Sequence, residues 1–281
     1  MKNTVRLTAL LAALTAGGNA LAADFSANSL GYRYAPNQSE PGVSDDVSKN
    51  VLTFTHFSVD KLGTNFFTID LLKSGSNDPA AGGGAGAQEY YGFYQRNFSI
   101  SKMTGNKDGY GFFKDLSLTA RVDAGTKNTA FAPAPRKLRL GVTAAMLISA
   151  GFWDVGIAAY KESNHNGIII PGFKPTGTSV SFKLAPVLDT AWSIPVGGIG
   201  TFGGFASIVG AKGKDGFGAE TKTETLIRAT FMFDVLGSKS GLSAGVGVEY
   251  WNNKFGCNNT TANPKNACKA TTPLLLINYQ L

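Results

Sequence analysis

The chain has 281 residues, of which 43% are hydrophobic and only 16% are charged, against roughly 25% charged residues in an average soluble domain. Glycine is abundant at 35 residues, and aromatic residues make up 11% of the chain. This amount of apolar material excludes an intrinsically disordered protein. The formal net charge of +7 comes without a basic run, which argues against nucleic acid as a partner.

The N-terminal segment 1–22 has the pattern of a secretory signal peptide. Lys2 and Arg6 form a basic region, residues 7–16 form a short apolar core, and Ala20 and Ala22 make a small-x-small cleavage site. The apolar core is shorter than the ~18 residues that a membrane helix needs. A buried N-terminal helix is the alternative. We expect an exported protein whose residues 23–281 form one domain.

The rest of the chain is dominated by alternation of apolar with polar or small residues, which predicts β-strands. In 116–123, for example, leucine, alanine and valine alternate with Ser117, Thr119, Arg121 and Asp123. The pattern predicts twelve strands, at about 26–35, 49–60, 63–73, 88–100, 116–123, 138–145, 153–160, 178–194, 199–211, 226–235, 242–251 and 272–281.

The segments between these strands are sorted by length. Those after the odd-numbered strands are long and polar, whereas those after the even-numbered strands are short, with 101–113 as the exception. An even strand number with long loops at one end and tight turns at the other is typical of outer membrane β-barrels. We therefore predict an all-β, transmembrane antiparallel barrel in the outer membrane of a Gram-negative bacterium. A soluble β-sandwich remains the alternative.

The chemistry of the two strand faces favours the barrel. The polar faces carry both signs of charge beside glycines and aromatic residues, which suits a lumen, while the apolar faces suit lipid. Aromatic residues close to strand ends fit interfacial girdles. These are Tyr32, Tyr34, Trp153, Tyr250 and Tyr279.

Cys257 and Cys268, the two cysteines of the chain, lie 11 residues apart in a polar segment. In an oxidising compartment this spacing predicts a loop-closing disulfide. A metal site would need further ligands nearby, and the two histidines, His56 and His165, are distant in sequence. We expect neither a metal nor a cofactor.

Several short strings resemble the Tsx-like family of nucleoside-specific, channel-forming outer membrane proteins. The longest is the segment 96–102, Arg-Asn-Phe-Ser-Ile-Ser-Lys, which continues through Gly-Phe-Phe-Lys-Asp at 111–115 into the strand 116–123. Further similar strings lie at 63–67, 70–74, 127–133, 161–167, 181–184 and 213–218. The resemblance implies a monomeric twelve-stranded barrel in outer membrane lipid that passes nucleosides or similar small solutes by diffusion.

A pore that binds a nucleoside weakly needs aromatic faces for the base and polar groups for the hydroxyls. Strand parity and the resemblance together give the candidate lumen residues, whose alternative role is to pair with one another. The aromatic candidates are Phe54, Phe66, Tyr90, Tyr94 and Trp251, and the charged candidates are Asp70, Glu89, Arg96, Arg121, Asp123, Arg139, Arg228 and Glu249.

Two other functions compete with a selective channel. Some outer membrane barrels are phospholipases with a histidine and a serine on the wall, and His56 and Ser58 share a face, but no orienting third group follows at a recognisable spacing. We therefore expect no catalytic residues. The other alternative is a general small-solute pore, or a structural or adhesin barrel without selective transport.

Overall fold

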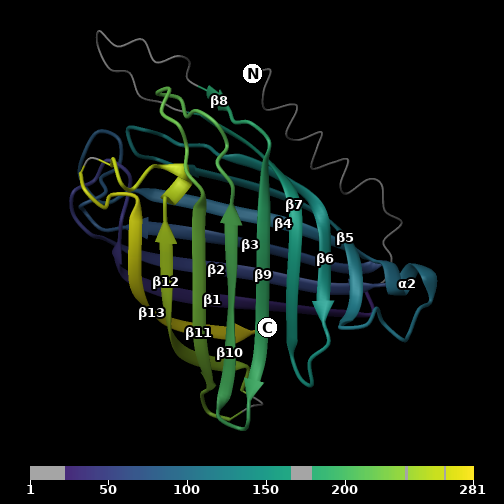
Figure 1. Ribbon diagram of the computed structural model, residues 1–281. Coiled ribbons are helices and arrows are strands. Elements are labelled where there is room, and N and C mark those ends of the chain that lie inside the picture. Colours follow the sequence, from purple (N-terminus) through teal and green to yellow (C-terminus); the bar gives the residue numbers. More distant parts are fainter. Residues whose placement is uncertain (1–22, 166–178, 238–239, 263) are drawn as a thin grey trace.

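A computed structural model describes residues 23–165, 179–237, 240–262 and 264–281, and these residues are almost entirely β-sheet (Figure 1). The predicted signal peptide lies outside them. The strands are β1 (Phe25–Gln38), β2 (Val47–Asp60), β3 (Gly63–Ser74), β4 (Gln88–Ser99), β5 (Phe113–Lys127), β6 (Arg136–Met146), β7 (Phe152–His165), β8 (Ser179–Ser181), β9 (Ala185–Val196), β10 (Gly200–Val209), β11 (Glu224–Asp234), β12 (Leu242–Asn252) and β13 (Lys269–Gln280).

Twelve of these strands form a closed antiparallel ring. Each strand pairs with its neighbour in sequence, β7 pairs with β9, and β1 closes the ring by pairing with β13. The three-residue strand β8 pairs with the end of β7 alone and stands outside the ring. The prediction of a twelve-stranded antiparallel barrel is confirmed. Closure leaves no sheet edge, so the backbone N–H and C=O groups of the wall are paired without water.

The block predicted at 178–194 is divided in the structure. Its first part is β8, and the barrel strand β9 begins at Ala185, one residue before Pro186. Proline has no N–H to donate to a ladder and is therefore found near the start of a strand. The remaining blocks coincide with barrel strands to within a few residues at each end.

The loops are sorted as the sequence predicts. The two-residue turn between β2 and β3 is held by Asp60, whose carboxylate accepts hydrogen bonds from the backbone N–H groups of Leu62 and Gly63. The longer connection between β4 and β5 starts with the helix α2 (Ile100–Thr104), capped by the Ser99 side chain. Both chain ends of the barrel lie at this short-turn end, which is periplasmic in outer membrane barrels. Among the described residues, no helix has the length and apolarity to cross a membrane.

The strand register separates two chemically different faces. Outward positions carry large apolar side chains exposed on the surface, such as Leu140 (53% exposed), Ile157 (61%) and Leu275 (59%). Inward positions carry charged side chains that are buried, such as Asp123 (3%) and Arg139 (6%). The five aromatic residues expected in interfacial girdles also take outward positions. The wall is therefore apolar outside and polar inside.

This inversion predicts a depth-dependent cost for an outward charge. Leu275 lies in the middle of β13 and Thr271 lies on the same face near the long-loop end. We expect Leu275→Arg to lower the free energy of unfolding in lipid vesicles by about 2–4 kcal/mol and Thr271→Arg by about 0–1 kcal/mol. Denaturant titration of the reconstituted variants measures both values. Equal costs at the two positions would contradict the assignment of this face to lipid.

Candidate functional site

The inner face is identified by buried charged side chains, among them Arg33, Lys49, Asp123 and Arg139. Arg33 of β1 binds Asp70 of β3 at 3.0 Å, and Lys49 of β2 binds Glu89 of β4 at 3.2 Å. Register then assigns every strand position to a face. The predicted lumen residues that lie on the inner face are Phe66, Asp70, Glu89, Arg121, Asp123, Arg139, Arg228, Glu249 and Trp251.

Four predicted lumen residues face outward instead, and their placement in the lumen was wrong. They are Phe54, Tyr90, Tyr94 and Arg96. A shift of one residue turns a side chain to the other face of a strand, and aromatic and polar residues occupy both faces of β4, so periodicity does not fix its parity. Arg96 is nevertheless satisfied, because it forms a bidentate ion pair with Asp60 at 2.7 and 2.8 Å near the short-turn end.

The residue beside Tyr94, Phe93, faces the lumen and belongs to a column of stacked groups. The Phe66 and Phe93 rings stack with their centroids 5.5 Å apart. The guanidinium of Arg121 lies over the Phe93 ring, 3.5 Å from its centroid. Asp123 fixes the guanidinium through two hydrogen bonds of 2.9 and 2.8 Å. Two aromatic faces and an oriented cation are thus held together on the wall of the lumen.

Next to this column, Tyr91 donates a hydrogen bond of 2.5 Å to Oδ2 of Asp123, the oxygen that also accepts from Nη2 of Arg121. The ammonium of Lys137 lies 5.1 Å from the Tyr91 ring centroid and 3.4 Å from its hydroxyl. Asp123 therefore connects an arginine and a tyrosine, and Lys137 is an inward cation that forms no ion pair within 4 Å among the described residues.

The other inward arginines of the wall are paired with carboxylates. Glu249 accepts from Arg228 at 2.5 Å and from the amide of Gln38 at 2.8 Å, and the Arg228 guanidinium lies 5.0 Å from the Phe205 ring centroid. Arg139 of β6 reaches past β7 to Asp189 of β9 at 2.5 Å. Each inward arginine of the described strands is thus bound to a carboxylate, whereas Asp154, Glu224 and Asp234 form no ion pair within 4 Å among the described residues.

Near the long-loop end, one buried carboxylate collects three ammonium groups from different parts of the chain. Glu40, in the loop after β1, binds Lys49 at 2.6 Å, Lys127 at 3.1 Å and Lys254 at 3.0 Å. Burial raises the pKa of the Glu40 carboxyl, but the three ammonium groups outweigh this and hold the pKa well below its usual range. Burial lowers the pKa of Lys254. We call Glu40 and these three lysines the Glu40 cluster.

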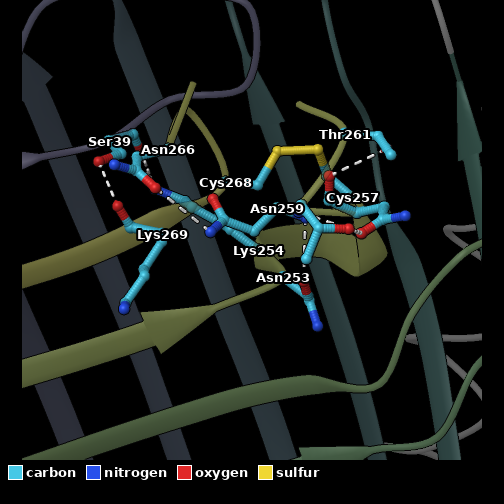
Figure 2. The surroundings of a disulfide bond; sticks show 11 residues. Ser39, Asn253, Lys254, Cys257, Asn259, Thr261, Asn266, Cys268 and Lys269 are labelled. Carbon is cyan, nitrogen blue, oxygen red and sulfur yellow. Dashed lines mark hydrogen bonds between the residues drawn. A yellow bond between two sulfur atoms is a disulfide. The ribbon is translucent and has the colours of Figure 1, made fainter. Parts of the chain in front are cut away.

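The disulfide lies close to this cluster. Cys257 and Cys268 are bonded, with 5.9 Å between their Cα atoms, which confirms the predicted pairing. Figure 2 shows the bond in the loop between β12 and β13. In the same loop the short helix η1 (Lys254–Gly256) starts with Lys254, whose backbone N–H donates to the Cys268 carbonyl. The disulfide-closed loop thus places Lys254, which is only 1% exposed, beside Glu40.

Sequence reasoning missed several inward residues, namely Arg33, Phe57, Tyr91, Phe93, Lys137, Tyr160, Glu162, Asp189 and Phe205. For β7 the signal was present, since the alternation in 153–160 puts Tyr160 on the same face as Asp154. For β4 the inward face Glu89–Tyr91–Phe93 could have been found from Glu89, which shares parity with Tyr91 and not with Tyr90.

His56 and Ser58, weighed above as a catalytic pair, lie on the outer face of β2. The Nδ1 atom of His56 lies 2.8 Å from the side-chain oxygen of Asn28 on β1, and Ser58 accepts from Asn65 at 3.3 Å. Each side chain is thus hydrogen-bonded to a neighbouring strand. His165 ends β7 at the long-loop end, far along the strand register from His56.

The fold is similar to several solved outer membrane barrels. The translocator domain of the autotransporter NalP from Neisseria meningitidis aligns with 98% of this chain and 95% of its own, at 11% identity and a TM-score of 0.46. The KdgM porin aligns with 89% of this chain and 98% of its own, at 8% identity and a TM-score of 0.44. No protein-family model and no curated protein sequence matches the chain.

The geometry of the chain itself shows the class of protein to which it belongs. A closed ring of twelve strands with an apolar exterior, ion pairs inside and long loops at one end is the architecture of a Gram-negative outer membrane β-barrel. The protein is an outer membrane β-barrel of twelve strands.

The Glu40 cluster predicts a large effect of neutralising one carboxylate. Glu40→Gln leaves the buried Lys254 ammonium without its carboxylate partner, whereas Lys49 keeps Glu89 and Lys127 keeps Asp78. Breaking a buried ion pair typically costs about 3–5 kcal/mol. We expect the long loops to exchange amide hydrogens faster in this variant, measured by hydrogen exchange of the reconstituted protein. Because the pKa of Glu40 is depressed, the native cluster loses stability only as the pH falls below the usual carboxyl range.

Glu220→Gln is the matched control, since Glu220 forms an ion pair of 4.0 Å with Lys214 in which both side chains are 66% exposed. Exposed pairs contribute about 0–1 kcal/mol. Equal exchange in the two variants would contradict a structural role for the Glu40 cluster.

Proposed function

We propose that this barrel is an outer membrane channel for the passive, weakly selective diffusion of nucleosides or similar small solutes. The observation that carries the proposal is the lumen column of Phe66, Phe93 and Arg121. Flat bases stack on aromatic side chains and on guanidinium planes with about 1–3 kcal/mol per base. An affinity of this size allows a solute to bind and still to leave, as conduction requires.

The charge arrangement of the lumen favours neutral solutes. The inward arginines are each paired with a carboxylate at 2.5–3.0 Å, as in Arg33–Asp70, Arg139–Asp189 and Arg228–Glu249. Paired charges offer donors and acceptors to hydroxyl groups and base edges but present no net field of one sign. A nucleoside, which is neutral and carries a flat base and a ribose diol, fits this chemistry.

A structural barrel is the second candidate. It is favoured by the Glu40 cluster, whose four side chains are all at most 8% exposed and come from loops and strands on several sides of the long-loop end. If these groups close the lumen, the barrel passes no solute, and its long loops form its working surface. Transport measurements separate this candidate from a channel.

Uptake into proteoliposomes tests the proposal. We expect the wild-type protein to admit uridine faster than glucose, and Phe93→Ala to reduce this ratio several-fold, because it removes a stacking surface worth about 1 kcal/mol or more. Tyr94→Ala is the matched control, since Tyr94 is the next residue and faces lipid. It should leave the ratio unchanged.

The possible outcomes are distinct. Equal entry of uridine and glucose into wild-type vesicles would replace the selective channel with a general small-solute pore. No entry of either solute would favour the structural barrel. An effect of Tyr94→Ala equal to that of Phe93→Ala would contradict the role of the stacked column.

A further inference from the structure

The carboxylates of the barrel wall lie almost entirely on the inner face, whereas its cations lie on both faces. Within the described strands, Asp60 is the one carboxylate at an outward position, and it is paired with Arg96 near the short-turn end. Towards the long-loop end the outward charges are all cations. They are Lys73, Arg136, Lys161 and Lys269. In β7 the adjacent residues Lys161 and Glu162 make the sorting plain, because the lysine faces outward and the glutamate binds Lys212 inside.

Two of these cations are neighbours on adjacent strands. Leu138 of β6 pairs with Lys161 of β7, and Arg136 pairs with Ser163. Arg136 and Lys161 are therefore diagonal neighbours, and residues in this relation lie about 7–8 Å apart. Neither forms an ion pair within 4 Å in the described part of the chain. The Arg136 hydrogen bonds found there use Nη1 alone, to the carbonyls of Gly125 and Pro135. The Lys161 ammonium donates one hydrogen bond, to the Phe182 carbonyl. Its other N–H groups and the remaining guanidinium donors of Arg136 are available to an anion.

Directly below these cations, toward the middle of the wall, the outer face is hollowed. The next outward pair after Leu138 and Lys161 is Leu140 and Ala159, and both line a hollow of about 610 Å³. A small outward side chain, that of Ala159, opens it, and the inward-facing Gly141 and Ala158 also line it. The other outward residues that line it are Val142, Ile157, Pro186, Leu188 and Ile208.

A second hollow of about 390 Å³ shares Leu188 with the first and continues towards the short-turn end. It is lined by Trp153, Val155, Thr190, Trp192, Ile194 and Phe202. From Ala159 to Trp153 the strand β7 advances roughly 20 Å at 3.3 Å per residue. An apolar strip of this length therefore runs along β7 and β9, with two cations at its long-loop end.

We propose that this strip is a binding site for a phosphorylated glycolipid of the outer leaflet, with a phosphate on Arg136 and Lys161 and an acyl chain in the hollows. Guanidinium and ammonium groups bind phosphate through charge-assisted hydrogen bonds. The long-loop end faces outward in outer membrane barrels, so these cations lie at the depth of outer-leaflet head groups. The strip is continuous with the lipid-facing wall, and it is independent of solute transport through the lumen.

Native mass spectrometry of the detergent-solubilised barrel with diphosphorylated lipid A tests the site. We expect the double substitution Arg136→Gln and Lys161→Gln to weaken lipid A binding at least tenfold. Ala159→Phe, which fills the hollow and keeps both cations, should weaken it as well. The matched control removes two other outward cations, with Lys73→Gln and Lys269→Gln, and should leave binding within twofold of the wild type.

Three results would overturn the proposal. The control variant could weaken binding as much as Arg136→Gln with Lys161→Gln, which would mean diffuse electrostatic attraction. Dephosphorylated lipid A could bind as tightly as the diphosphorylated form, which would exclude phosphate recognition. Phosphatidylglycerol could bind equally well, which would exclude a site specific for the outer-leaflet glycolipid. The circular dichroism spectrum of each variant, expected to equal that of the wild type, verifies that the barrel is folded.

Discussion

The pairing of every barrel strand with two neighbours is the constraint on which the rest of the structure depends. An unpaired backbone N–H or C=O group in hydrocarbon costs several kcal/mol, so the wall must close, and β1 and β13 meet to close it. Closure then gives each residue only two possible orientations, towards lipid or towards the lumen. The apolar outside, the ion pairs inside and the cations at the outer rim all follow from that alternation.

The charged side chains inside the barrel stabilise one another, and they also orient groups that a solute in the lumen can contact. Buried carboxylates are costly unless they are paired, and Asp123, Glu249 and Glu40 are each bound by at least one cation. The same pairs orient guanidinium groups against aromatic rings, as at Arg121 over Phe93 and Arg228 near Phe205. The same ion pairs can therefore stabilise the wall and hold the side chains that line the lumen.

The sequence predicts the strand number, the sorting of the loops, the disulfide and the parity of strands such as β5 and β6, because there the apolar and polar residues alternate cleanly. It fails for β4, where Tyr90, Tyr94 and Arg96 face outward. Arg96 is stabilised there by Asp60, which belongs to a turn between two other strands. The Glu40 cluster could not be predicted either, since it joins segments up to 214 residues apart.

The orientation of β4 tests the central claim most directly, because its adjacent residues Phe93 and Tyr94 differ in face and resemble each other in chemistry. The described residues contain no free cysteine, so Phe93→Cys and Tyr94→Cys each introduce one reactive thiol. In lipid vesicles, we predict that a water-soluble maleimide modifies the thiol at position 93 and not that at position 94. Modification of the thiol at position 94 with protection at position 93 would contradict an apolar exterior around a polar lumen.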